Sequence, residues 1–256
     1  TLHALGTNDG WTADQRGHSA FLYQLGNSTI LIDCGEPVGR SLRSAGVKPD
    51  DLDGLFLSHL HCDHVGGFFM LMQGFWLDQR TRPLTVHMPE EGLVPVRRML
   101  DAAYIFEELM PSDLNFTALT VGEPFEVSDI HVTAHPTSHL HQLKEHFVKK
   151  YPAKYEAFCF LLESNETRVA HSADIGAIAD LEPLLTQPLD LLVCELAHVE
   201  PKKLFTYLAD KEIGQVAFMH LSRHYREKLD ELKNQADSIL GDLPHTFLDD
   251  GDLIEV

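Results

Sequence analysis

The sequence predicts an α/β fold with two β-sheets packed face to face and covered by helices, a four-layer αββα sandwich. Short apolar runs typical of buried strands recur in both halves of the 256 residues, and helical patterns lie between many of them. No internal repeat and no low-complexity linker divides the chain. Helices and sheets that are apolar on one face bury that face against another layer, so this order of elements favours stacked sheets with helices outside. We expect one domain over residues 1–256.

Strand patterns open the first half of the chain. Residues 19–24 and 28–33 are apolar runs on either side of the turn dipeptide Gly26-Asn27, which predicts a β-hairpin. Gly46 and Pro111 end two of the helical patterns that follow. The further elements expected in this half are strands over residues 54–58 and 84–87 and helices over residues 38–45, 65–77 and 93–109.

The second half has the same rhythm with more strands. Its strand patterns cover residues 125–127, 130–134, 158–163, 168–171, 189–195 and 215–220 and the region near Phe247. Its helical patterns cover residues 179–185, 201–209 and 225–240. The segment 140–155 is basic and amphipathic, unlike its surroundings, and we expect it to form a short helical insertion.

The charge balance restricts the partners of the chain. Twenty Lys and Arg against 39 Asp and Glu give a net charge of −19 with histidine neutral. Nucleic-acid affinity comes largely from Lys and Arg that release counterions, so a large nucleic acid is not an expected substrate. No apolar run approaches the roughly 18 residues of a membrane span, and Cys34, Cys62, Cys159 and Cys194 form no CxxC pair. We expect a soluble, cytoplasmic protein with free thiols.

Four metal-competent side chains fall within six residues. His59 and His61 follow the strand pattern of residues 54–58, and side chains two positions apart on a strand point the same way. Asp63 and His64 come after a turn and point in a second direction. One loop can therefore serve two neighbouring ions, with the first pair on one ion and the second pair on the other. Imidazole and carboxylate groups are typical ligands of zinc and related divalent metals.

Two ions need more ligands than one loop supplies, and further candidates lie where other apolar runs end. These candidates are His139, Asp174 and His220. Buried strands deliver the side chains at their ends to a common edge of a sheet, which would bring distant residues together. Three other histidines compete with them: His135, His141 and His171. Spacing alone does not choose among His135, His139 and His141.

The run His59-Leu60-His61-Cys62-Asp63-His64 resembles the HxHxDH signature of the metallo-β-lactamase fold superfamily, whose fold is this αββα sandwich. Motifs similar to those of its ribonuclease Z-like branch are Leu5-Gly6-Thr7, Ile32-Asp33-Cys34-Gly35, Thr133-Ala134-His135-Pro136-Thr137-Ser138-His139, Ser172-Ala173-Asp174 and His220-Leu221-Ser222. The resemblance implies that His139 completes the first site, that Asp174 bridges the ions and that His220 completes the second site. We expect two divalent metal ions, with zinc foremost and manganese or iron as alternatives.

The chain departs from the tRNA 3′-processing members of that branch. Cys194 stands where those enzymes carry a histidine thought to assist leaving-group protonation, and His224-Tyr225 stands where they have an arginine-tyrosine pair. Their long, glycine-rich arm that grips tRNA is absent, and only the 140–155 insertion is present. These departures and the acidic balance make a tRNA 3′-processing endonuclease the less favoured interpretation. His198 and His224 are the candidates for a proton donor.

These features predict a dinuclear metal-dependent hydrolase in which a metal-bridged hydroxide attacks the substrate. Asp63 can both ligate and accept the proton of the nucleophile, and Asp33 and Ser58 can orient the imidazoles. A small phosphodiester is the favoured substrate. A carboxylic ester or lactone is the alternative on the same site, and a non-catalytic metal-binding protein is the alternative from another class. A homodimer is expected by analogy with relatives.

Two sets of side chains would distinguish these substrates. Arg223 and the lysines of the 140–155 insertion can bind a phosphate, whereas an aromatic wall would suit an apolar acyl group. The residues of that wall would be Phe68, Phe69, Phe75 and Trp76, which packing in the core would explain equally.

Overall fold

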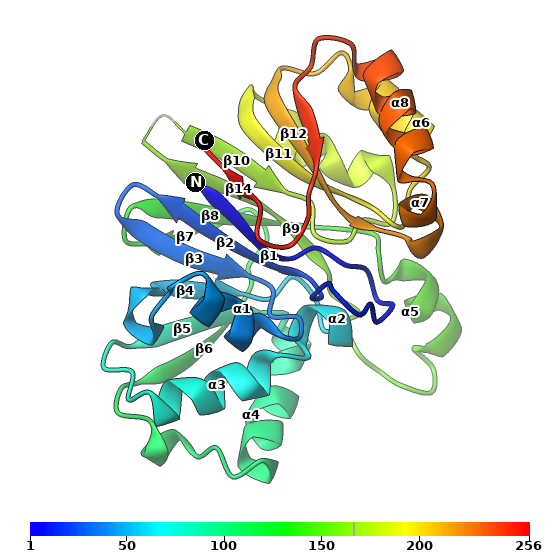
Figure 1. Cartoon of the computed structure of the whole chain (residues 1–256). Helices are drawn as coiled ribbons and strands as arrows, with labels where there is room; N and C mark the ends of the chain where they lie inside the picture. The colour runs from blue at the N-terminus through cyan, green and yellow to red at the C-terminus, as the bar shows by residue number, and fades with distance from the viewer. Residues whose placement is uncertain (166) are drawn as a thin grey trace.

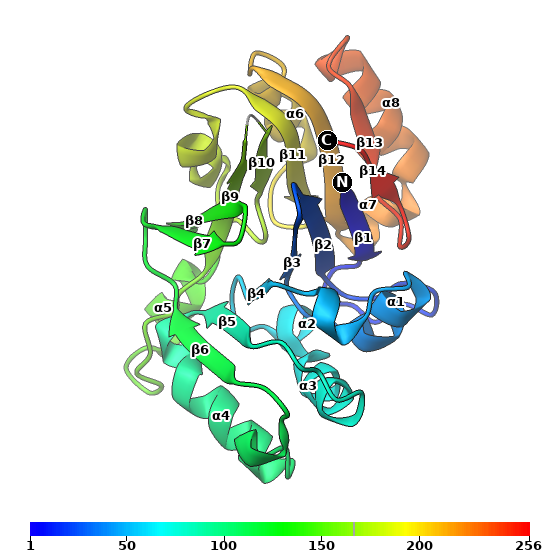
Figure 2. The ribbon, with the colours of Figure 1, turned by 90° about the vertical axis from the view of Figure 1, so that its left-hand side faces the viewer.

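Two β-sheets packed face to face form the centre of the molecule, and helices cover their outer faces (Figures 1 and 2). The computed structural model describes residues 1–165 and 167–256. Within these residues each sheet has seven strands. The four-layer αββα sandwich predicted from the sequence is therefore confirmed.

The first sheet contains the N-terminal strands and, at one edge, the last strand of the chain. Its strands are β1 (Leu2–Gly6), β2 (Ala20–Leu25), β3 (Ser28–Ile32), β4 (Gly54–Phe56), β5 (Leu84–Met88), β6 (Leu114–Ala118) and β14 (Leu253–Ile254). They lie in the order β14-β1-β2-β3-β4-β5-β6. The pairs from β14 to β3 are antiparallel, and those from β3 to β6 are parallel. The expected hairpin is present as β2 and β3.

The second sheet has the same division between antiparallel and parallel strands. Its strands are β7 (Pro124–Val127), β8 (Ile130–Pro136), β9 (Phe158–Ser164), β10 (Thr167–His171), β11 (Leu189–Leu196), β12 (Ile213–Leu221) and β13 (His245–Phe247). Neighbours from β7 to β10 are antiparallel, and neighbours from β10 to β13 are parallel. Parallel strands need crossover connections, and the helices provide most of them.

The helices are divided between the two outer faces. The helices of the first half are α1 (Val38–Ser44), α2 (Cys62–Val65), α3 (Phe68–Leu77) and α4 (Leu93–Ala102). Those of the second half are α5 (His141–Phe147), α6 (Pro201–Leu208), α7 (Arg223–Glu227), α8 (Leu229–Leu240) and a 3₁₀ helix, η4 (Ile178–Leu185). Figure 2 shows α3 and α4 outside one sheet and α6 and α8 outside the other.

Three apolar layers hold these four layers of structure together. Phe21 and Phe160 belong to the layer between the two sheets. Leu55 packs with Phe68 in the layer between the first sheet and its helices, and Phe205 belongs to the layer between the second sheet and its helices. Burying apolar surface on both faces of each sheet favours association of the sheets and helices by roughly 25 cal/mol per Å².

Three predicted helices differ from the structure by more than one residue. The helix expected over 65–77 begins at Phe68, because Val65 is the last residue of the separate helix α2. The helix expected over 93–109 ends at Ala102, because Tyr104 has a left-handed φ of 58°, and a short 3₁₀ helix follows at Glu107–Leu109. The helix expected over 225–240 is broken at Lys228, which separates α7 from α8. The predictions were wrong at these points because periodicity cannot locate a change in backbone direction.

Three strands of the first sheet were not predicted: β1, β6 and β14. β6 carries exposed and half-buried residues after its first position, and β14 has only two residues. Edge strands of this kind have weak apolar patterns, so pairing within the sheet fixes β6 and β14 more than their own sequence does. β1 is different, because it is buried between β14 and β2.

All four cysteines are free thiols, as expected; Cys34, Cys159 and Cys194 are buried, and Cys62 is exposed. In residues 1–165 and 167–256, every helix is too short or too polar to cross a membrane.

Candidate metal centre

Side chains from several strand ends meet at one edge of the sandwich. His59 and His61 lie between β4 and α2, and α2 itself carries Asp63 and His64. The remaining candidates follow β8, follow β10 and lie near the end of β12: His139, Asp174 and His220. The helices α2, α5 and α7 lie along this edge (Figure 1).

A first cluster of possible metal ligands contains His59, His61, His139 and Asp174. One possible ligand atom from each of these residues lies within 4.8 Å of the others. His139 Nε2 is 3.2 Å from His61 Nδ1. Asp174 Oδ2 is 3.8 Å from His59 Nε2 and 3.6 Å from His139 Nε2. Three imidazoles and one carboxylate form a donor set suited to zinc or a related divalent metal.

A second cluster lies beside the first and contains Asp63, His64, Asp174 and His220, with ligand atoms again within 4.8 Å of one another. Asp63 Oδ2 is 3.6 Å from His64 Nε2 and 3.7 Å from His220 Nε2. Asp174 Oδ1 is 3.3 Å from His64 Nε2 and 3.4 Å from His220 Nε2. Asp174 therefore faces the first cluster with Oδ2 and the second with Oδ1.

Several buried polar atoms of these clusters lack a hydrogen-bond partner. They are His59 Nε2, His64 Nε2 and Asp174 Oδ1. An unpaired buried polar group costs roughly 1–3 kcal/mol, so such groups call for a ligand. Divalent ions would satisfy all three atoms, and the residues present therefore fit a metal in each cluster.

The loop after β8 shows why His139 is the histidine that reaches the first cluster. The Thr137 hydroxyl donates to the backbone oxygen of Asp174 at 2.9 Å. The Ser138 backbone N–H and hydroxyl both donate to Asp180 Oδ2, at 2.9 and 2.8 Å. These bonds fix the chain immediately before His139. The sequence left three histidines open at this point, and the geometry selects one of them.

Asp33 and Ser58 contact the Nδ1 atoms of two imidazoles, as the sequence suggested. His64 Nδ1 donates to Asp33 Oδ2 at 2.6 Å, which directs Nε2 into the second cluster. Asp33 also accepts bonds from the Ser58 N–H and hydroxyl, each at 2.8 Å. The Ser58 hydroxyl lies 3.1 Å from His59 Nδ1. Partners of this kind fix the orientation of a ligating imidazole and raise its basicity.

Two supporting residues were not found from the sequence. The Ser19 hydroxyl lies 3.0 Å from His220 Nδ1, although 201 positions separate the two residues. Glu195 is fully buried and lies 3.1 Å from His198 Nδ1. No local pattern marks either contact, because each depends on how distant strand ends meet.

The surroundings shift the pKa values of the imidazoles in opposite directions. Burial lowers the pKa of His59 well below its usual value and that of His139 to about 4. Burial alone would also lower the pKa of His64, but the charges of Asp174 and Asp33 outweigh it and raise that pKa well above its usual value. The first cluster thus favours neutral imidazole, the form that binds metals.

His198 is the proton-donor candidate that the structure brings to the clusters. Its Nδ1 is 3.8 Å from Asp174 Oδ2, and its ring centroid is 4.6 Å from that of His139. Burial opposes protonation, but the hydrogen bond and charge of Glu195 raise the pKa of His198 to about 9. With 36% of its side chain exposed, His198 can meet a molecule arriving from solvent.

The other histidine candidates lie outside the clusters. His224 is exposed on α7, and its ring lies 5.4 Å from that of Tyr225. His135 is half-buried within β8, and His141 is exposed at the start of α5. His171 is buried, and its Nδ1 lies 2.7 Å from the Tyr23 hydroxyl.

The aromatic residues proposed for an acyl substrate and the arginine proposed for a phosphate lie in different parts of the molecule. Phe68 and Phe75 are buried in the core beneath the first sheet, and Phe69 packs against that core. Arg223 is exposed on α7 and pairs with Glu227 at 3.2 Å. The three phenylalanines therefore follow the core interpretation, whereas Trp76 is half-buried on α3.

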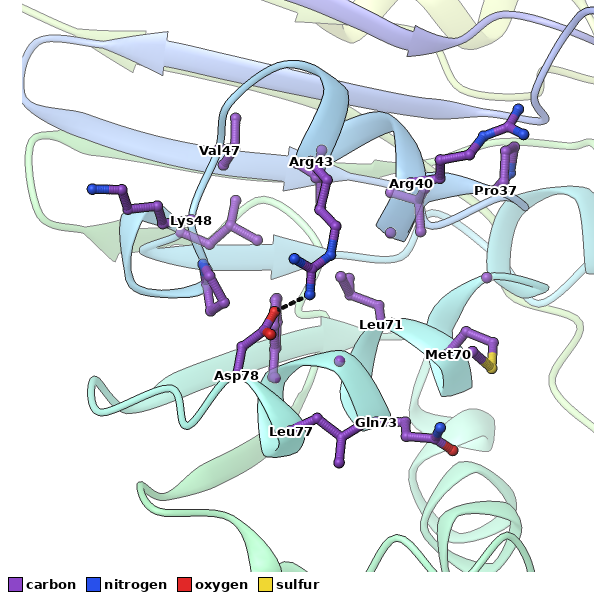
Figure 3. Close-up of a pocket in the computed structure, with 18 of the residues that line it drawn as sticks. Pro37, Arg40, Arg43, Val47, Lys48, Met70, Leu71, Gln73, Leu77 and Asp78 are labelled. Atoms are coloured by element: carbon purple, nitrogen blue, oxygen red, sulfur yellow. Dashed lines mark hydrogen bonds and ion pairs between the residues drawn. The ribbon is translucent and has the colours of Figure 1, made fainter.

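A pocket of about 750 Å³ lies between α1 and α3 (Figure 3). Leu71 and Met70 come from one wall, and an ion pair joins Arg43 of α1 to Asp78 at the end of α3. None of the histidines or aspartates of the two clusters lines this pocket. It is separate from the candidate metal centre.

The two mixed sheets and the paired His/Asp clusters at their strand ends define a protein of the metallo-β-lactamase fold. Sequence similarity to ribonuclease Z proteins supports the ribonuclease Z-like branch, so both parts of the resemblance seen in the sequence are confirmed. Within that class, the chain belongs to the family described as Anti-Pycsar protein Apyc1, whose model matches residues 1–238.

Similar proteins support the fold and the branch. Ribonuclease Z from Archaeoglobus fulgidus is 32% identical over 136 residues, which are 53% of this chain and 43% of that protein. The chain thus matches less than half the length of this curated relative. The metallo-β-lactamase fold protein YhfI from Bacillus subtilis superposes with a TM-score of 0.77 at 18% identity, covering 98% of this chain and 96% of that one. Human tRNase Z, short form, gives 0.76 at 16% identity, covering 99% and 98%. At these identities, the two structures establish the fold.

Proposed function

We propose that this protein is a metal-dependent hydrolase that binds one divalent ion in each cluster, zinc foremost, and cleaves a small phosphodiester. The placement of Asp174 carries the proposal, because its two oxygens lie 3.3–3.8 Å from imidazole nitrogens of both clusters. The first ion would be held by His59, His61, His139 and Asp174, and the second by Asp63, His64, Asp174 and His220.

Two neighbouring divalent ions would lower the pKa of a bound water towards neutrality and stabilise negative charge on the attacked group. The side chains would manage the protons. Asp63, which is 13% exposed, would accept the proton that the attacking water loses. The water oxygen would bond to phosphorus, the ester P–O bond would break, and His198 would give its proton to the leaving oxygen. His224 remains a second candidate for that donor, although it lies outside the clusters.

Three observations favour a small phosphodiester. The name ribonuclease Z, carried by the curated relative, denotes cleavage of phosphodiesters. A net charge of −19 would repel a long polyanion but would disfavour a singly charged diester much less. Phe68 and Phe75 are buried in the core, so they do not form part of an apolar wall that could bind an acyl group. A carboxylic ester or lactone is the second candidate, since the same metal centre can attack a carbonyl carbon.

A parallel assay with measured metal content tests the proposal. We expect turnover of bis(p-nitrophenyl) phosphate to exceed that of a lactone panel and of pre-tRNA, to stop after chelation and to return with zinc. His59→Ala should remove metal and activity together. The matched control is His131→Ala, since His131 is an exposed histidine of β8 outside both clusters. Full activity of His59→Ala, or pre-tRNA turnover at the rate of the diester, would contradict the proposal.

A further inference from the structure

Glu195 lies at the end of β11 and binds two loops at once. Its carboxylate is fully buried, and both oxygens accept hydrogen bonds. Oε1 accepts from the Ile175 N–H at 3.1 Å, and Oε2 accepts from the N–H groups of Ala197 at 2.5 Å and His198 at 3.0 Å. Ile175 directly follows Asp174, so one carboxylate ties the loop of the shared metal ligand to the loop of His198.

The same carboxylate also fixes the ring of His198. Oε1 lies 3.1 Å from His198 Nδ1. Within residues 1–165 and 167–256, every other hydrogen-bond partner of the Glu195 carboxylate is a backbone N–H. The carboxylate therefore acts as an acceptor, and Nδ1 carries the donated hydrogen. Nε2 is then the nitrogen left for a substrate, on a side chain that is 36% exposed and whose ring lies 4.6 Å from that of His139.

We propose that Glu195 is a positioning residue for hydrolysis: it holds the His198 ring through Nδ1, which leaves Nε2 free to donate to the leaving group. A buried carboxylate that orients a histidine in this way keeps the ring in one rotamer and one hydrogen-bonding arrangement, as in hydrolases where an aspartate orients the catalytic histidine. The role of His198 as donor rests on the proposed function, whereas the Glu195–His198 hydrogen bond does not.

The first test measures how the rate depends on the leaving group. A p-nitrophenolate leaves without a proton, whereas the alkoxide leaving group of a cyclic nucleoside monophosphate needs one. In Glu195→Gln we expect turnover of the cyclic nucleotide to fall about 100-fold, the lower range for loss of general acid catalysis, and turnover of bis(p-nitrophenyl) phosphate to fall less than about threefold. His198→Ala should show the same difference between the two substrates, and the double variant should show no larger difference than either single variant.

The second test observes the hydrogen bond directly. In ¹H–¹⁵N spectra of imidazole nitrogens, wild-type protein should show a slowly exchanging Nδ1–H resonance that His198→Ala removes. Glu195→Gln should remove or shift this resonance, because an amide cannot accept at both positions. The matched control is Glu200→Gln, since Glu200 is exposed two positions after His198 and pairs with Lys203. That variant should leave the resonance and both rates unchanged.

The outcomes separate this inference from the proposed function. An equal loss of both substrates in Glu195→Gln, or loss of bound metal, would mean that Glu195 serves only the fold. An unchanged His198 resonance in Glu195→Gln would overturn the inference even if activity fell. If Glu195→Gln does not fold, a His198→Ala variant without the leaving-group split would overturn it. If the wild type hydrolyses neither diester, the proposed function fails, and the resonance alone decides whether Glu195 holds His198.

Discussion

The two clusters use similar side chains in different surroundings. In the first, His61 and His139 are half-buried. In the second, the imidazoles of His64 and His220 are both buried, and Asp33 lies 2.6 Å from His64 Nδ1. An imidazole that donates to a buried carboxylate is a better oriented and more basic ligand. We therefore expect an ion in the second cluster to be held more tightly, and an ion in the first cluster to face the side from which solvent arrives.

The largest expected effect comes from removing what the two clusters share. Asp174→Asn should lower metal content in both clusters and reduce diester turnover at least about 1,000-fold, because charge stabilisation by the ions supplies several kcal/mol. Metal analysis of the purified variant gives the stoichiometry. Asp210→Asn, at an exposed aspartate, should behave as wild type. Retention of two ions by Asp174→Asn would remove the basis for treating the clusters as one centre.

Changing one ligand in each cluster should separate them. His61→Ala should lose the first ion and keep the second, whereas His220→Asn should lose the second. Asparagine is the better replacement at His220, because that residue has a left-handed φ of 50°, which asparagine tolerates. One retained ion is expected in each variant, with slower release to a chelator in His61→Ala. Equal rates of metal release from His61→Ala and His220→Asn would contradict the proposed difference in affinity between the two clusters.

The supporting carboxylate should matter more than the supporting hydroxyls. Asp33→Asn should lower the affinity of the second cluster for its ion about 10–100-fold, which is the usual effect of removing such a hydrogen-bond partner. Ser19→Ala should lower this affinity less, because the Ser19 hydroxyl, 3.0 Å from His220 Nδ1, carries no charge. Chelator competition with each variant measures both affinities. A larger effect at Ser19 would reverse the order proposed here.

A buried histidine outside the clusters provides a baseline for pH effects. His87 stacks on Phe56 with ring centroids 4.4 Å apart, and burial lowers its pKa to about 4. The unfolded chain protonates this group near pH 6.5, so stability is lost as pH falls from about 6.5 towards 4. Between pH 7.5 and pH 6 the wild type should lose about 0.8 kcal/mol more unfolding free energy than His87→Phe.

Urea unfolding at the two pH values measures this difference. His131→Phe, at an exposed histidine, should keep the wild-type pH dependence. Equal losses in wild type and His87→Phe would show that the metal-centre histidines dominate the acid response.

The site was predictable where its chemistry is concentrated in the sequence. Four ligand-type residues in six, followed by polar residues at three later strand ends, are enough to propose the clusters, and the structure brings all seven side chains together. The choice of His139 over its neighbours was not predictable, because it depends on bonds from Thr137 and Ser138 to segments about 40 residues away. The contacts of Ser19 and Glu195 have the same origin.

The fold shows the same limit. The sandwich follows from the alternation of apolar runs and helical patterns, which each segment carries in its own residues. The break at Lys228 and the edge strand β14 do not follow from local patterns, because they depend on how neighbouring elements pack. Local patterns therefore identify the layers, and long-range contacts decide where elements end and which side chains support the site.

The sharing of Asp174 has a consequence for how metal is acquired. Whichever ion binds first must order the one carboxylate that the other also needs, so the second ion pays a smaller entropic cost. Loading should then be positively cooperative, and by thermodynamic linkage each ion raises the affinity for the other by the same factor. At limiting metal, the tighter second cluster would fill first and would raise the affinity of the first cluster, so activity would follow the occupancy of the first cluster.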